Sequence, residues 1–169
     1  MDELALALTT AFDLVLGLDP GLVEIVLLSL RISLTAVLLA TALALPFGAA
    51  VALVRFPGRR IVIVLLNAAM GLPPVIVGLV IYLLLSRAGP LGEAGLLFTP
   101  TAMVIAQTVL VFPIIAALAR QTIADLHEEY DEQLRSLGSG TWQSIVTLIV
   151  DGRMRLMTGV LAVFGSAIA

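Results

Sequence analysis

Charged residues are scarce in this sequence, and both cysteine and lysine are absent from it. Only 12% of the 169 residues are charged, against about 25% in a typical soluble domain. The lack of cysteine excludes a disulfide framework, a thiolate metal site and a thiol nucleophile. The sequence begins with Asp2 and Glu3 where a secretory signal would carry positive charge, so we expect no cleaved signal peptide. No G-x-x-x-x-G-K-[ST] motif occurs, so the chain does not cradle ATP phosphates in that way.

Hydrophobic residues, by contrast, make up 60% of the chain, and the mean hydropathy is +1.14. These values predict an all-α, polytopic transmembrane helical bundle formed by a single membrane domain over residues 1–169. Crossing about 30 Å of hydrocarbon takes roughly 20 apolar residues, and four segments qualify or begin to: 22–54, 61–85, 101–119 and 156–169. Because the last segment is short, we expect the chain to be truncated within the fourth span. Residues 1–20 predict either an amphipathic helix at the membrane surface or a further core helix.

The distribution of arginine predicts the orientation of the chain, because short cytoplasmic loops carry an excess of basic residues. Most of the nine basic residues fall in two loops on one side: Arg55, Arg59, Arg60, Arg120, Arg135, Arg153 and Arg155. We therefore expect residues 120–155 to form a cytoplasmic coupling region, and the N-terminus to lie outside. The expected location is the inner or plasma membrane, which the chain crosses several times.

The second apolar segment is interrupted by the stretch MGLPPVIVGL at residues 70–79. Pro73 and Pro74 each remove a backbone donor, and freed carbonyls at membrane depth are tolerated only inside protein or beside a watery cavity. Gly71 and Gly78 flank the break and allow a neighbouring helix to approach closely. The stretch therefore predicts a kinked span, which either gates a translocation pathway or serves packing alone.

Few polar residues occur within the expected spans, and such residues often mark a pathway. The candidates for a pathway are Asn67, Gln107 and Thr108. Gln107 is the strongest of them, and its alternative role is a hydrogen bond between helices. Arg31 lies near the outer end of the first span, where we expect it to pair with Glu24 or to extend to the lipid headgroups.

Residues 120–155 have an amphipathic pattern. Apolar residues recur every four positions from Leu126 to Leu134, which predicts a short helix between two spans. Gly138 and Gly140 should end this helix, and an apolar helix then resumes at an exposed Trp142. Such a segment is suited to docking on a partner, since Trp and Arg are enriched at protein interfaces. The alternative is a solvated loop lying on the chain's own bundle.

The same region contains the single histidine, His127, and several carboxylates: Glu128, Glu129, Asp131 and Glu132. Their spacing is not that of an H-E-x-x-H metal site. We therefore expect a solvated polar helix that faces a partner, with no metal site. No combination of nucleophile, base and orienting residue is visible, so no catalytic residue is expected.

Residues 132–151 resemble the cytoplasmic signature loop of binding-protein-dependent ABC importer permeases. The family pattern is Glu-Ala-Ala, three residues, Gly, nine residues and then Ile-any-Leu-Pro. Matching places are taken by Glu132, Gly138, Leu148 and Val150, whereas the alanines and the proline are replaced by Gln133, Leu134 and Asp151. The stretches SLRISLTAVLLATALALPFGAAVAL and NAAMGLPPVIVGLVIYLLLSRAGPLG resemble the molybdate, tungstate and sulfate branch of this family, and the second is most similar to tungstate-type permeases.

The resemblance implies a fold like that of type I ABC importer permeases, and a role as the permease subunit of an ATP-driven oxyanion importer, with tungstate as the expected substrate. It implies as partners a second copy of the chain, two cytoplasmic ATPase subunits that bind ATP and Mg, an extracytoplasmic oxyanion-binding protein and the lipid bilayer. No nucleic acid, and no cofactor bound by the chain itself, is implied. The residues assigned to coupling with the ATPase are Glu132, Leu134, Gly138, Ser139, Gly140, Thr141 and Trp142. At Gly138, a side chain is expected to hold the coupling helix off its groove.

Other interpretations of the sequence remain. Within the same class, molybdate or sulfate is the alternative substrate. From another class, the chain is a membrane scaffold or regulatory protein whose cytoplasmic loop binds a different partner. An intramembrane hydrolase or transferase would need paired ionisable residues within the spans, and the sequence does not have them.

Overall fold

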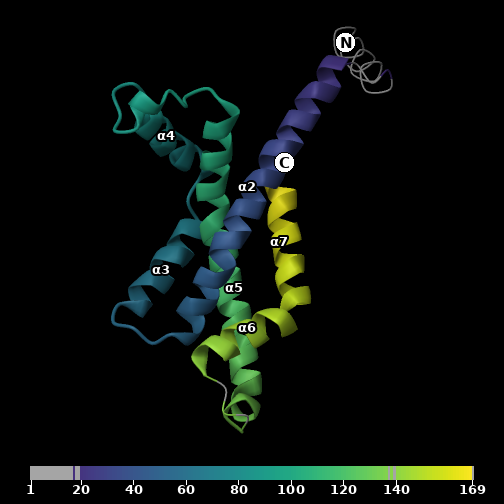
Figure 1. Ribbon diagram of the computed structural model, residues 1–169. Helices are drawn as coiled ribbons and strands as arrows, with labels where there is room; N and C mark the ends of the chain where they lie inside the picture. Colours follow the sequence, from purple (N-terminus) through teal and green to yellow (C-terminus); the bar gives the residue numbers. More distant parts are fainter. Residues whose placement is uncertain (1–16, 18–19, 137, 139, 169) are drawn as a thin grey trace, which may run out of the picture.

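The structure is a computed structural model that describes residue 17 and residues 20–168, apart from 137 and 139. Every regular element within these residues is a helix, which confirms the expected all-α class. In chain order the elements are α2 (Pro20–Leu53), α3 (Arg59–Met70), α4 (Pro74–Leu85), the 3-10 helix η1 (Gly92–Ala94), α5 (Pro100–Ser136), α6 (Thr141–Asp151) and α7 (Arg153–Ile168) (Figure 1). The amphipathic segment expected over residues 1–20 lies almost entirely outside the described residues.

The centre of the fold is the contact between the two longest helices, α2 and α5 (Figure 1). Small residues recur at every fourth position along α2 and are buried: Ala36, Ala40, Ala44, Gly48 and Ala52. A Cβ atom at Gly48 would lie 2.5 Å from the carbonyl oxygen of Ala116 on α5, so the two backbones touch there. Stripes of small residues let membrane helices approach closely enough for van der Waals contacts to hold them together.

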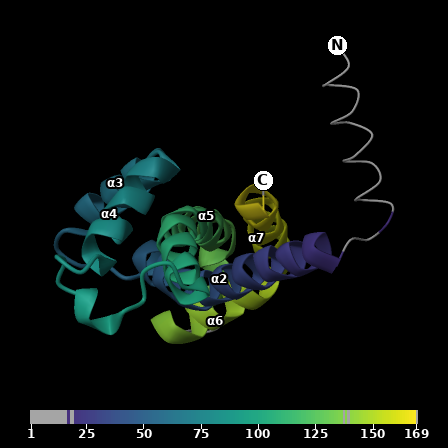
Figure 2. The same cartoon turned by 90° about the horizontal axis from the view of Figure 1, so that it is seen from above.

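The remaining helices flank this pair. In two views at right angles, α3 and α4 lie on one side of α5 and α7 lies on the other (Figures 1 and 2). One core cluster joins α2, α3, α5 and α7, and it includes Val37, Leu66, Val111, Ile115 and Val163. The rings of Phe47 on α2 and Phe112 on α5 add a tilted aromatic contact, with centroids 5.6 Å apart.

A second core cluster occupies the end of the molecule where α6 lies. It joins the far part of α5 to α6, α7 and the end of α2, and it includes Ala52, Ile123, Leu126, Leu134, Ile145, Leu148 and Leu156. The prediction of a short separate helix after residue 119 is wrong, because α5 runs unbroken from Pro100 to Ser136. No glycine or proline interrupts the chain between Pro113 and Ser136, and the apolar face that begins at Leu126 packs against α6.

Two of the described helices, α2 and α5, are long and apolar enough to cross a membrane. The segment expected as a second span, 61–85, consists of α3 and α4, which are bent by 104° at their break. The break contains Gly71, Leu72 and Pro73, and Pro74 begins α4. This angle is far above the roughly 20° at which a helix counts as sharply kinked, so the pair is either a broken span or a re-entrant loop. The 16 residues of α7, at 1.5 Å each, make it about 24 Å long.

Candidate functional site

The turn between α5 and α6 contains Gly138 and lies at one end of the molecule (Figure 1). Gly138 has a φ of +66°, in the left-handed region, which glycine adopts without steric cost. A Cβ atom built on it would meet nothing within 4 Å. Within this chain, therefore, glycine is favoured at this position by the backbone conformation and not by a lack of space for a side chain.

Gly140 is the N-cap residue of α6 and has an extended backbone, with φ −72° and ψ 162°. Its N–H donates a hydrogen bond to Oε1 of Gln143 at 3.2 Å. This is half of a capping box, because glycine has no side chain with which to return the bond. Among the other predicted coupling residues, Ser139 lies outside the described residues. The structure describes Thr141 and Trp142 only as the first residues of α6 and does not describe their side chains, so the predicted exposure of Trp142 stays a prediction.

The structure separates two of the predicted coupling residues by burial. Glu132 is exposed, and its carbonyl oxygen accepts a hydrogen bond from Ser136 Oγ at 2.7 Å. Leu134 is only 7% exposed and belongs to the core cluster shared with α6. Leu134 therefore holds α5 to α6 and offers no surface to a partner.

The outer face of α6 was missed by sequence reasoning. Ile145 and Leu148 point into the core, whereas Val146 and Val150 are 47% and 51% exposed. Gln143, also exposed, precedes these valines by one and two helical turns. The sequence could have predicted this face, because these positions are spaced three and four residues apart and such positions share one face of a helix.

Of the predicted pathway residues, Gln107 and Thr108 are neighbours on α5 and both are half-buried. The hydroxyl of Thr108 donates to the carbonyl oxygen of Val104 at 2.7 Å and lies 3.5 Å from that of Ala36 on α2. Its contacts are thus those of a side chain between two helices. Bonding to the preceding turn in this way is common for threonine within a helix.

Gln107 lines a cavity of about 370 Å³ between α2, α5 and α7. Its Oε1 atom is buried, with no hydrogen-bond partner among the described residues. The cavity's other polar wall residues are Ser29 and Ser33 on α2, which sequence reasoning missed. The Ser33 hydroxyl is 3.5 Å from the carbonyl oxygen of Ala167. The sequence could have predicted that Ser29 and Ser33 act together, because a spacing of four residues places both hydroxyls on one face of α2.

The remaining predicted pathway residues lie apart from this cavity. Asn67 is exposed on α3, and in the described part of the chain no hydrogen bond or shared cavity joins it to Gln107. A Cβ atom at Gly78 would meet nothing within 4 Å, and one at Gly71 would meet only the carbonyl oxygen of Ala68 in its own chain segment, at 3.6 Å. Among the described helices, therefore, no other one approaches either glycine closely.

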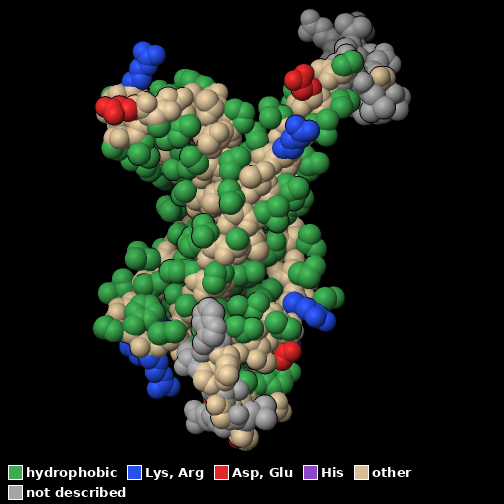
Figure 3. Space-filling model, in the orientation of Figure 1, with side chains coloured by type: hydrophobic (Ala, Val, Ile, Leu, Met, Phe, Trp, Pro, Cys, Tyr) green, Lys and Arg blue, Asp and Glu red, His purple; other side chains and the backbone are tan. Residues whose placement is uncertain are grey.

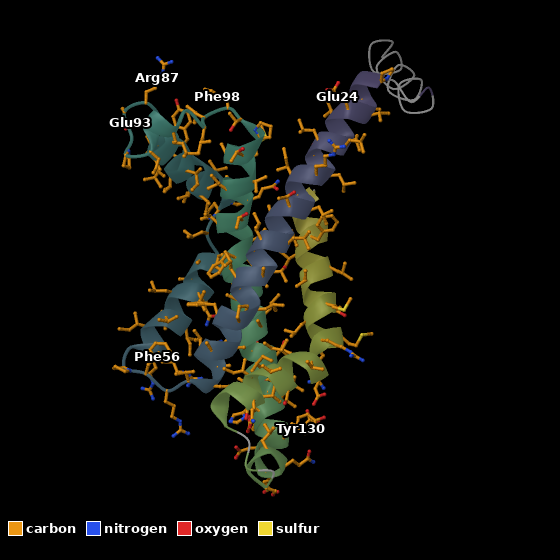
Figure 4. The ribbon with its side chains drawn as sticks, viewed as in Figure 1. Glu24, Phe56, Arg87, Glu93, Phe98 and Tyr130 are labelled. Carbon is orange, nitrogen blue, oxygen red and sulfur yellow. The ribbon has the colours of Figure 1, made fainter. Side chains whose placement is uncertain are left out.

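The two ends of the molecule differ in their residues. Glu24, Arg87, Glu93 and Phe98 lie at one end, while Phe56 and Tyr130 lie at the other (Figure 4). The visible face between the two ends is mainly hydrophobic, with charged groups near the ends (Figure 3). The α2–α3 loop lies at the same end as α6 (Figure 1), and Arg55 lies in this loop while Arg59 and Arg60 begin α3. This is the distribution expected of a chain whose middle is in lipid.

Two arginines clarify the roles of these basic residues. For Arg31 the sequence predicted either a pair with Glu24 or extension to the lipid headgroups; both residues are exposed and line one surface hollow, and no ion pair within 4.0 Å joins them in the described structure. Arg59 has a structural role, since its Nε donates to the Val51 carbonyl at 2.6 Å and its Nη2 to the Ala52 carbonyl at 2.7 Å. A cation bonded to the last carbonyls of α2 stabilises that helix end.

The acidic stretch of α5 forms one weak contact, between His127 Nε2 and Asp131 Oδ1 at 3.7 Å. In the residues that the structure describes, no group of three or more His, Cys, Asp or Glu side chains is arranged to hold a metal ion.

Long apolar helices, a buried stripe of small residues between them, and charge near the two ends define this chain as a polytopic helical membrane protein. More narrowly, it belongs to the family of binding-protein-dependent transport system inner membrane components, whose model matches residues 44–169. The chain is 36% identical over 169 residues to the tungstate uptake system permease protein TupB of Peptoclostridium acidaminophilum, covering all of this chain and 74% of that relative.

Two further relatives belong to the same kind of system. The chain is 39% identical over 149 residues to a probable anion ABC transporter permease protein of Haloferax volcanii, covering 88% of this chain and 64% of that protein. It is 33% identical over 136 residues to the molybdenum transport system permease protein ModB of Escherichia coli K12, covering 74% of this chain and 58% of that protein. The chain thus spans between about three fifths and three quarters of the length of these relatives.

Proposed function

We propose that this chain is the permease subunit of an ATP-driven importer that takes up tungstate. The observation that carries the proposal is the 36% identity, along the whole of this chain, to a tungstate uptake permease. Molybdate is the second candidate substrate, because the chain is 33% identical to a molybdenum permease. Sulfate is a third, since a sulfate transport permease of Synechocystis is 30% identical over 95 residues.

The proposed assembly contains two copies of the permease, two ATPase subunits that bind ATP and Mg, and an external protein that delivers the anion. The ATPases act at the end with α6, and the N-terminus faces outside. The arginine-bearing α2–α3 loop at the α6 end supports this orientation, since basic loops stay cytoplasmic. ATP hydrolysis belongs to the partner subunits in this assembly.

Coupling is proposed to run through the α5–α6 turn. Glu132, the turn glycines Gly138 and Gly140, and the outer face of α6 would seat on the ATPase, together with Ser139, Thr141 and Trp142. The buried Leu134 would then transmit the displacement to α5. Closure of the ATPase pair would rock the spans between inward-open and outward-open states.

The translocation pathway is proposed to use the polar groups of Gln107 and Thr108, with Ser29 and Ser33 nearby. Neutral amide and hydroxyl donors bind an anion without the charge that would trap it. The break at Pro73 and Pro74 is proposed as a gate at the seam between two copies, with Gly71, Gly78 and Asn67 facing the partner. Their exposure in the single chain supports this placement.

The test is oxyanion uptake in the source organism with and without this gene. Tungsten, molybdenum and sulfur in washed cells are counted by elemental mass spectrometry at trace external concentrations. We expect tungsten accumulation to collapse in the deletion and to return with the native gene. A fall in molybdenum uptake alone would mean that the substrate is molybdate and not tungstate. Unchanged uptake of all three elements, with no redundant importer present, would contradict the proposal.

Gly138 variants test the coupling step separately. Gly138→Arg should fail to restore uptake while the protein remains in the membrane. Gly138→Ala is the matched control, because alanine and arginine both carry the ordinary steric cost of the left-handed conformation, whereas alanine adds only a methyl group in open space. Restored uptake with Ala but not with Arg supports a surface that a bulky group blocks. Normal uptake with Gly138→Arg would contradict the proposed coupling role.

A further inference from the structure

A groove of about 240 Å³ lies between α2, α6 and α7 and is distinct from the cavity at Gln107. Its wall consists mainly of the apolar residues Leu45, Ile149, Leu156, Met157, Val160 and Leu161, and the two polar lining residues are Thr41 and Arg153. Arg153, the first residue of α7, is exposed and lines the groove beside Ile149 of α6. None of the described side chains assigned above to coupling or to the pathway lines this groove.

The dimensions of the groove match part of a lipid chain. From Arg153 to Leu161 helix α7 advances eight residues, or roughly 12 Å at 1.5 Å per residue. One leaflet of the hydrocarbon core is about 15 Å thick, half of the full 30 Å. The residues along the open side are exposed, with Met157 at 57% and Leu161 at 64%. In a membrane protein, such a surface faces hydrocarbon or another helix.

A positive charge stands at one end of the groove. Arg153 is exposed, and no acidic side chain lies within 4.0 Å of it among the described residues. Its position is fixed by the tight α6–α7 connection, where the Gly152 N–H donates to the Leu148 carbonyl and the Leu156 N–H to the Gly152 carbonyl, both at 2.9 Å. A Cβ atom at Gly152 would lie 2.7 Å from Cδ1 of Leu126, so this connection is closely packed.

We propose that this groove binds one acyl chain of an anionic phospholipid whose phosphate pairs with Arg153. An apolar channel with an unpaired cation at one end complements a molecule with a hydrocarbon tail and a negatively charged head. Basic pockets between membrane helices bind anionic headgroups by the same chemistry. The site does not depend on which oxyanion is transported, so the two proposals can fail independently.

Native mass spectrometry of the purified full chain tests the site. Phosphatidylglycerol and phosphatidylcholine with the same acyl chains are added at equal concentrations, and the lipid retained is counted. We expect the native chain to retain phosphatidylglycerol about 5-fold better, the ratio that corresponds to one arginine near an anionic lipid surface. Arg153→Gln should lower this ratio to about one. Arg60→Gln, at an exposed arginine outside the groove, should leave it unchanged.

A second variant tests the groove itself. Met157→Trp places a large side chain over the channel at an exposed position and should reduce retention of both lipids with little change in thermal unfolding. Three results would overturn the proposal. These are equal retention of the two lipids by the native chain, equal losses in both arginine variants, and efficient cross-linking of Met157→Cys to a second copy. The last result would make the groove an interface between copies.

Discussion

Gly48 offers a direct test of the contact at the centre of the fold. A Cβ atom there would lie 2.5 Å from the Ala116 carbonyl oxygen, 2.9 Å from Ala119 Cβ and 3.0 Å from the Arg120 backbone nitrogen. Each of these neighbours is backbone or a Cβ atom, so none can rotate away. The substitution Gly48→Ala must therefore push α2 and α5 apart.

The expected cost combines two opposing terms. Overpacking a well-packed site by one group costs about 1–3 kcal/mol. Alanine in the interior of a helix recovers up to about 1 kcal/mol relative to glycine. With the full gain, we expect Gly48→Ala to lower the free energy of unfolding by up to about 2 kcal/mol, and to be about 1–3 kcal/mol less stable than a glycine-to-alanine variant that has the same gain without the clash.

The assay is reversible unfolding in mixed micelles with increasing SDS, followed by the fluorescence of Trp142, which is the chain's one tryptophan. Gly165→Ala is the matched control, because Gly165 is also in a helix and a Cβ atom there would meet nothing within 4 Å. The control should unfold at or slightly above the SDS fraction of the native chain. Coincident transitions for the two variants would refute the contact of α2 with α5 at Gly48.

Two further substitutions test the end of α2 and a turn residue with a positive φ between η1 and α5. Arg59→Met removes the charged donors to the Val51 and Ala52 carbonyls and should lower the free energy of unfolding by about 1.5–3 kcal/mol. The control Arg60→Met, at an exposed neighbour, should change it little. Equal effects of the two variants in the same SDS assay would contradict the capping role of Arg59. Phe98 has a φ of +63°, and its side chain is 86% exposed. Phe98→Gly removes the strain of this backbone conformation and should raise the free energy of unfolding by about 1 kcal/mol. A loss of stability would mean that the ring is covered by lipid or by a partner.

The sequence predicted the helical class and the general positions of the apolar segments because both depend on composition and local pattern. Pro73 and Pro74 predicted the break between α3 and α4 because the effect of proline is also local: it removes a backbone donor and disrupts the turn that precedes it. The 104° angle could not be predicted, because it depends on how α3 and α4 both pack against α5. The role of Arg59 was also hidden, since its two acceptors lie on the preceding helix.

The candidate sites were predicted less well than the fold. A polar residue in an apolar run identifies a candidate such as Gln107, but its neighbours on other helices are set by tertiary packing. Ser29 and Ser33 share the cavity with Gln107 although more than 70 residues separate them from it in sequence. Leu134 shows the opposite case: its place in a motif suggested a partner contact, and its burial assigns it to the chain's own core.

The continuity of α5 joins the two candidate sites physically. Its 37 residues, at 1.5 Å each, extend about 55 Å and carry Gln107 and Thr108 in one part and Glu132 and Leu134 in another. On the proposed function, a displacement of the α5–α6 turn therefore reaches the polar residues through one helix, with no loop between them. The one weakened point on this route is Pro113, which lacks a backbone donor. Because α5 also touches every other described α-helix, tilting it changes the packing of the whole bundle, which is the behaviour that alternating access requires of a permease.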